Sequence, residues 1–238
     1  GNHLARCYRI IDLGTQKSEY MGQTKYLHKV MLGWEIHGTN DDGTPIKMKD
    51  GRPFAIFKNY TMSWSDKATL RKDLQSWRGK PFSAEEMRRF DLKTILGVHC
   101  MLNVIERQGQ DGKTYVNVDN ISPVPAVIRK SGLPDGVNKL ELFNLSEPDM
   151  EMFETFSDGL KKKIEQSPEW QARKGREYAK GETASGADRL ARAGEAFFRG
   201  VVALGDGEAV DHPEQGPGIG EVGRHLDGRL EFLLLRLQ

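Results

Sequence analysis

The chain has 238 residues, of which 37% are hydrophobic and 29% are charged. It contains no apolar run of about 18 residues, so neither a membrane span nor a membrane partner is expected. The net charge of +1 is unevenly distributed: residues 1–135 carry 21 Lys+Arg against 15 Asp+Glu, whereas residues 136–238 carry 14 against 19. This asymmetry favours an anionic partner for the first part of the chain.

Cysteine and histidine usage predicts a reduced protein without a metal or other cofactor. Cys7 and Cys100 both lie in apolar alternating segments, where a free buried thiol is more common than a disulfide. The six histidines are scattered and show no metal-ligand spacing. The chain starts without a basic and apolar signal segment, so a cytoplasmic protein is expected.

Three strands are predicted in the first 64 residues, over 3–13, 26–37 and 52–64. In the second of them, Trp34 shares the apolar face with Val30, Leu32 and Ile36, and Lys29 lies on the opposite face. The polar residues 14–24 between the first two strands are predicted to form a mobile loop.

The period then changes from about two residues to about 3.6. Leu70, Leu74 and Trp77 recur at helical spacing, which predicts a helix over 66–77 with Asp66 as its cap. Ser83 and Glu86 have the spacing of a capping box, which predicts a second short helix ending near Phe90.

A hairpin over residues 98–121 completes the pattern, with Asp111-Gly112 at its turn. The order strand, strand, strand, helix, strand, strand is that of an OB-fold, a small Greek-key barrel that binds oligonucleotides. We therefore expect an all-β to α+β fold: a five-stranded OB-fold barrel with helices between strands 3 and 4, plus a C-terminal helical extension.

Three regions are expected: an OB-fold domain over 1–135, the helical extension over 136–180, and a Gly/Ala/Arg-rich tail over 181–238 that is poorly ordered. In the extension, a helix starting at Ser146 would place four apolar side chains on one face: Phe153, Phe156, Leu160 and Ile164. The tail contains a candidate short helix around 187–199. Its apolar end, LEFLLLRL, fits either a partner-binding helix or a shifted reading frame.

Five segments resemble the OB-fold single-stranded DNA-binding proteins of tailed bacteriophages: RIIDLGTQ (9–16), KVMLGWEI (29–36), KNYTMSWSDKATLRKDLQSWRGKPF (58–82), FDLKTILGVHCMLNV (90–104) and DGKTYVNVDNISPVP (111–125). The helical segment 142–170 is also similar to that family. The resemblance implies a protein that coats unpaired DNA in the bacterial host cytoplasm, together with replication or recombination proteins. A homo-oligomer is left open.

Binding of single strands needs cations for the phosphates and aromatic faces for the bases. On an OB-fold these groups gather on strands 2 and 3 and on the loops joining strands 1–2 and 4–5. The nucleic-acid-binding candidates are Lys29, Trp34, Phe57, Lys58, Tyr60, Arg107, Lys113 and Tyr115, with Lys17 and Lys25 as further cations.

The aromatic candidates compete for one strand face. Trp34 shares the parity of an apolar row, which favours a core position over stacking. Tyr60 shares the parity of Lys58, and because lysines rarely point into a core, Tyr60 is assigned to the ligand face. Phe57 has the opposite parity, so a regular strand cannot aim both rings at one ligand. Tyr115 is expected to face outward.

The sequence contains no catalytic motif, and an enzyme is not expected. The leading hypothesis is a single-stranded DNA-binding protein that acts by base stacking and phosphate contacts. The alternative is a replisome or recombination adaptor that binds protein partners through the barrel and the C-terminal helix.

Overall fold

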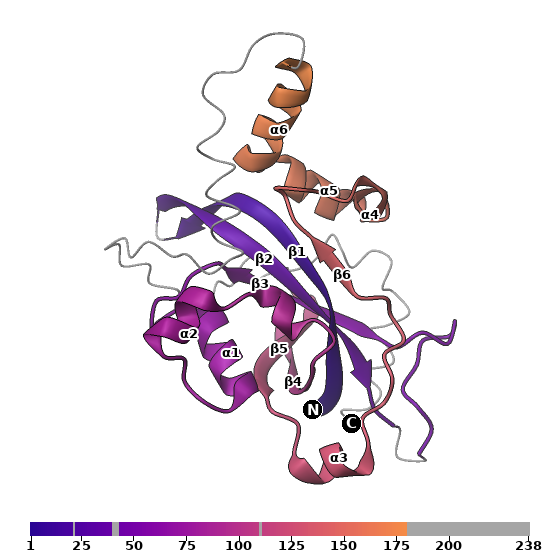
Figure 1. Ribbon diagram of the computed structural model, residues 1–238. Coiled ribbons are helices and arrows are strands. Elements are labelled where there is room, and N and C mark those ends of the chain that lie inside the picture. The colour runs from indigo at the N-terminus through magenta and orange to yellow at the C-terminus, as the bar shows by residue number, and fades with distance from the viewer. Residues whose placement is uncertain (21, 40–42, 110, 180–238) are drawn as a thin grey trace.

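The computed structural model of the protein describes residues 1–20, 22–39, 43–109 and 111–179 (Figure 1). The expectations for the tail 181–238, including the helix around 187–199, lie outside these residues.

A mostly antiparallel sheet forms the body of the molecule, and a few helices surround it (Figure 1). This architecture agrees with the expected all-β to α+β class. The strands are β1 (Asn2–Tyr20), β2 (Gln23–His37), β3 (Ala55–Thr61), β4 (His99–Gln108), β5 (Thr114–Ser122) and β6 (Glu141–Phe143). Their order is β3-β2-β1-β4-β5, with β6 paired to β1, so the sheet is open between β3 and β5.

Strand β1 is the centre of the sheet because both of its edges are used. Along one edge it pairs with β2 from Leu4↔His37 to Tyr20↔Gln23. Along the other edge, residues 2–6 pair with β4 and residues 9–11 pair in parallel with β6. Register shifts at 7–9 and 12–14 bend the strand, as expected for β-bulges.

The predicted loop over 14–24 is wrong. Residues 14–20 continue β1, and residues 23–28 begin β2, so this polar segment is a long two-stranded hairpin. The polar sequence gave the wrong prediction because a two-stranded ribbon that extends beyond the core needs no alternating apolar residues. The ladder hydrogen bonds alone satisfy its backbone. The third strand is also shorter than the predicted 52–64.

The connection from β3 to β4 contains α1 (Thr69–Arg78), α2 (Ala84–Arg89) and the 3-10 helix η1 (Leu92–Ile95). The predicted helix after β3 is confirmed, but Asp66 is not its cap. Ala68 holds the N-cap position, and Asp66 forms an ion pair with Arg71 instead, at 2.5 Å. The capping box of Ser83 and Glu86 is confirmed by both of its hydrogen bonds.

The main hydrophobic core lies between one face of the sheet and α1. Trp34 is fully buried there, and its ring centroid is 6.2 Å from that of Trp77 in α1. Leu70 and Leu74 lie with Trp77 on the buried face of α1, as their spacing predicted. Cys7 and Cys100 are both free and buried in this core, and burial raises the pKa of Cys7 to about 12.

A second hydrophobic core holds the C-terminal segment against the other face of the sheet. After α3 (Ala126–Ser131) and β6 come α4 (Met150–Glu154), α5 (Asp158–Glu165) and α6 (Pro168–Ala179). The predicted continuous helix is divided in two, because Ser157 caps a new helix through the N–H of Leu160. The four predicted apolar side chains nevertheless all lie in this core, where they meet Ile11, Leu13 and Met31 of the sheet.

Among the described residues, no helix is both long enough and apolar enough to span a membrane.

Candidate nucleic-acid interface

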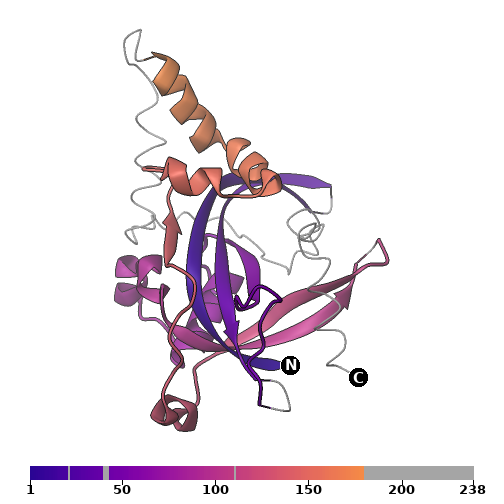
Figure 2. The same ribbon diagram turned by 90° about the vertical axis from the view of Figure 1, so that its right-hand side faces the viewer.

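Two hairpins extend from the body of the sheet and reach toward the same side of the molecule (Figure 2). The β1–β2 arm consists of β1 and β2 between Gly14 and Lys29. The β4–β5 arm consists of β4 and β5 between Val104 and Asp119. These arms contain the connections from β1 to β2 and from β4 to β5.

The β1–β2 arm carries a tyrosine directly opposite a lysine. Lys17 pairs with Tyr26 in the register, so their side chains lie on one face of the ribbon. Tyr26 is 68% exposed. Lys17 is also exposed and forms an ion pair with Glu19 at 2.5 Å, which raises its pKa. One position further along, Lys25 lies opposite Ser18, so its side chain is on the other face of the ribbon. The face of Tyr26 therefore carries one neighbouring cation, Lys17.

The β4–β5 arm repeats this pairing with an arginine. Arg107 is opposite Tyr115 in the register, and both are candidates that the sequence identified. The Tyr115 hydroxyl donates a hydrogen bond to Asp111 at 2.6 Å. Arg107 donates to Asp119 at 3.0 Å, and Lys113 lies 3.7 Å from Asp111. Each cation of this arm is therefore already next to a carboxylate.

The structure corrects the roles of Trp34 and Tyr60. Trp34 is fully buried and Tyr60 is 2% exposed, so neither ring can stack on a base in this fold. Lys58 and Tyr60 share a strand face, as predicted, but α1 covers that face. Lys58 Nζ and the Tyr60 hydroxyl both donate to one oxygen of Asp73 in α1, each at 2.8 Å.

The inference failed because a lysine on a strand face does not have to point to solvent. A carboxylate on a covering helix can pair with it. Burial and the neighbouring charge of Asp73 also raise the pKa of Tyr60 well above its usual value. Lys58, Tyr60 and Trp34 therefore belong to the interior side of the sheet, away from both arms.

Lys29 and Phe57 lie on the opposite face of β2 and β3. Phe57 is half-buried and pairs with Gly33 in the register, where an added Cβ would come within 2.6 Å of the Phe57 ring. Tyr8 contacts the ring edge at a centroid distance of 6.4 Å. Lys29 is also half-buried. Burial lowers the pKa of Lys163 in α5, and the positive charge of Lys29 lowers it further.

The structure thus sorts the candidates into three places. The arms hold Arg107, Lys113, Tyr115, Lys17 and Lys25. The sheet face that packs against the C-terminal helices holds Lys29 and Phe57, and the face that packs against α1 holds Trp34, Lys58 and Tyr60. The sequence reasoning missed Tyr26. The available signal was an aromatic residue at the start of the predicted second strand, directly after the polar residues 14–25.

In the part of the chain that the structure describes, no group of three or more His, Cys, Asp or Glu side chains is arranged to hold a metal ion. Comparisons with protein-family models, with curated proteins and with solved structures found no match for the chain.

Proposed function

We propose that this protein binds single-stranded DNA between its two arms, as a phage-type coating protein acting in replication or recombination. The observation that carries the proposal is the repeated pairing of a tyrosine with a basic residue, Lys17 with Tyr26 and Arg107 with Tyr115. Stacking on aromatic rings combined with cations for the phosphates is the general means of holding single strands without sequence preference.

We also propose that the sheet is an OB barrel opened between β3 and β5. Three observations support this assignment: the chain order of the elements, the pairing of β1 with both β2 and β4, and the closeness of β3 to β5 across the open side. In such a barrel the connections between strands 1–2 and 4–5 border the ligand groove. Both arms of this chain occur at those connections.

The chemistry of the proposed complex follows from the arms. A base would stack on Tyr26 while a neighbouring phosphate meets Lys17, and a second base would stack on Tyr115 beside Arg107. The ion pairs of these cations are exposed and cost little to exchange for phosphate. Binding should therefore weaken steeply with salt.

A titration of fluorescently labelled oligo-dT, followed by anisotropy at low and at high salt, tests the proposal. Duplex DNA of the same length is the control. The proposal predicts saturable binding of the single strand that weakens with salt, and much weaker binding of the duplex. The absence of binding at low salt would refute it.

A protein-binding adaptor is the second candidate. The apolar stripe from Phe153 to Ile164 does not offer a surface for a partner, because it is buried against the sheet. A different observation now favours it: Val127, Leu133, Val137 and Leu140 are exposed in and after α3. Exposed apolar patches are typical of protein contacts. Loss of partner capture in a Val127→Ser, Leu140→Ser variant that still binds DNA would support this role.

A further inference from the structure

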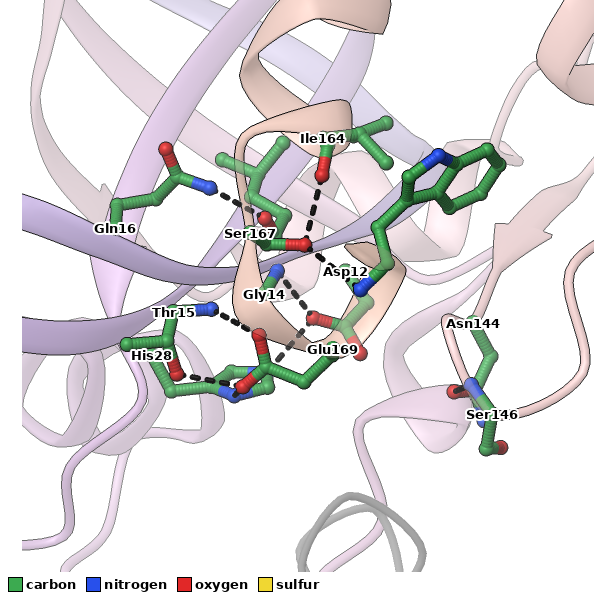
Figure 3. Close-up of polar contacts among 12 residues, drawn as sticks. Asp12, Gly14, Thr15, Gln16, His28, Asn144, Ser146, Ile164, Ser167 and Glu169 are labelled. Carbon is green, nitrogen blue, oxygen red and sulfur yellow. Dashed lines mark hydrogen bonds and ion pairs between the residues drawn. The ribbon is translucent and has the colours of Figure 1, made fainter. Parts of the chain in front are cut away.

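The start of α6 is joined to the β1–β2 arm at its base (Figure 3). Glu169 accepts hydrogen bonds from the backbone N–H of Thr15 at 2.9 Å and from the Thr15 hydroxyl at 2.6 Å. Residues 154 positions apart in the chain therefore meet at the edge of β1. β6 pairs with β1 only at residues 9–11, so it does not reach Thr15. The Glu169 carboxylate instead accepts the hydrogen bond of the Thr15 N–H.

His28 extends this contact to β2. Its Nε2 lies 2.7 Å from Asp12 Oδ1, and its Nδ1 lies 3.6 Å from Glu169 Oε1. Asp12 is 1% exposed and also accepts the N–H of Gly14 at 2.9 Å. An imidazolium between two carboxylates thus connects β1, β2 and α6 at one point. We call Asp12, Thr15, His28 and Glu169 the latch.

The approach of α6 requires a glycine in β1. Gly14 has a φ of +68°, and a Cβ at this position would lie 2.5 Å from the Cβ of Ser167. No other residue type fits both this backbone conformation and this spacing. A second hydrogen bond runs beside the latch, from Gln16 Nε2 to the carbonyl oxygen of Lys163 at 2.9 Å.

The position of the latch gives it a consequence beyond stability. It lies where the β1–β2 arm leaves the second core, whose sheet residues end at Leu13 and Met31. Beyond that point the ribbon is two-stranded, and an isolated two-stranded hairpin is marginally stable in water. The presentation of Tyr26 and Lys17 therefore depends on how firmly the base of the arm is held.

We infer that Glu169 is a positioning residue for DNA binding, which holds the β1–β2 arm in its binding conformation through the latch. This inference rests on the proposed function. Glu169 itself lies at the base of the arm and acts through Tyr26 and Lys17. If loosening the latch lowers the fraction of molecules with an ordered arm to about one in ten, the apparent dissociation constant rises about tenfold.

The test compares Glu169→Ala with wild type and with Glu147→Ala, which removes the same charge from an exposed position in the same segment. Two quantities are measured: the dissociation constant for labelled oligo-dT, and amide hydrogen exchange over residues 15–28. We expect Glu169→Ala to accelerate exchange in this arm, with exchange over 104–118 unchanged, and to weaken binding about tenfold. Glu147→Ala should do neither.

A double-mutant cycle separates positioning from general destabilisation. If Glu169 acts through the arm, its substitution should have little further effect in a Tyr26→Ala background and its full effect in a Tyr115→Ala background. Equal effects in both backgrounds would overturn the inference, as would faster arm exchange with unchanged affinity. Should wild type fail to bind oligo-dT, the proposed function falls and the positioning role falls with it. The rate of amide hydrogen exchange over residues 15–28 would still show whether the latch stabilises the β1–β2 arm.

Discussion

The two arms share one geometry but differ in charge. Each places a tyrosine opposite a basic residue in the register. Residues 15–28 carry two lysines and one glutamate, a net of +1 without His28, whereas residues 104–119 carry two cations and three carboxylates, a net of −1. The β1–β2 arm is therefore equipped for phosphates as well as bases, and the β4–β5 arm mainly for bases.

The arms also differ in how they are held. The β1–β2 arm is fixed at its base by α6, far along the chain, through Glu169 and His28. The β4–β5 arm is stabilised by contacts within itself, where Tyr115 bonds to Asp111 and Arg107 to Asp119. At its base, Val104 exchanges backbone hydrogen bonds with Gly1. We conclude that a side-chain substitution in α6 can alter the first arm from a distance, whereas the base of the second arm is held by main-chain contacts.

The largest difference should come from the two tyrosines. Tyr26→Ala is expected to weaken binding of oligo-dT by about 1–3 kcal/mol, or roughly 5- to 150-fold, because the exposed ring is lost as a stacking surface. Tyr115→Ala should lie at the lower end of this range, since its arm carries a net negative charge, which opposes the binding of neighbouring phosphates. Anisotropy titration measures both. Tyr26→Phe, which keeps the ring, should bind like wild type; equal loss in the Phe and Ala variants would contradict stacking.

Raising the pH should loosen only the β1–β2 arm. Burial alone would lower the pKa of His28, but its hydrogen bonds to Asp12 and Glu169 raise it from 6.5 to about 9. Because the folded-state pKa is raised, this stabilisation is complete below about pH 6.5 and is lost as the pH rises through about 9. Glu169 stays ionised throughout this range, since hydrogen bonds to His28 and Thr15 outweigh its burial and lower its pKa to about 2.

Urea denaturation of wild type and His28→Gln between pH 7 and pH 10 measures this effect. The free energy of unfolding of wild type should fall by roughly 2 kcal/mol more than that of the variant. Among the neighbouring groups, Lys163 of α5 has a pKa that is lowered by burial and by the positive charge of Lys29. A Lys163→Gln variant of each protein removes that contribution. Parallel pH profiles for wild type and His28→Gln would contradict the charged latch.

Salt dependence should distinguish the cations of the two arms. Replacing Lys17 by Gln should reduce the slope of log K against log salt by about 0.7, which corresponds to one phosphate contact on a single strand. Lys25→Gln, on the other face of the ribbon, should change the slope less. Arg107→Gln should change the slope less, because the β4–β5 arm carries a net charge of −1, which repels the phosphates. A larger slope change from Arg107 than from Lys17 would reverse the assignment of phosphate binding to the β1–β2 arm.

The smallest effect concerns the carboxylates of the β4–β5 arm. Asp119→Asn frees Arg107 and removes a negative charge from the arm, so affinity at low salt should rise about two- to fivefold. Asp135→Asn removes the same charge outside both arms and should have less effect. A weaker complex with Asp119→Asn would mean that this carboxylate orients Arg107 for binding.

The sequence predicted the elements whose side chains pack in a core. It did not predict the elements whose side chains pack little. The alternation of Val30, Leu32 and Trp34 and the helical spacing of Leu70 and Leu74 identified buried elements. The β1–β2 arm was missed because its outer residues bury little, so no hydrophobic period marks it. Its pairing is determined by backbone hydrogen bonds and by α6, which periodicity cannot reveal.

The candidate site was predictable in part for a related reason. Arg107, Lys113 and Tyr115 were found because a short turn signal fixes a hairpin and its outward positions. Lys58 and Tyr60 were misplaced because the partner of their face, Asp73 on α1, is a tertiary contact. The latch joins residues 12, 28 and 169, and nothing in their local sequence indicates that they meet.

Photo-crosslinking tests the central claim most directly. A single-stranded oligonucleotide carrying photoreactive iodouracil would be irradiated in complex with the protein at low salt, and the crosslinked residues mapped by mass spectrometry. The account predicts crosslinks at both Tyr26 and Tyr115, lost when excess unlabelled oligo-dT competes. Crosslinks confined to other surfaces, with neither tyrosine modified, would contradict binding between the two arms.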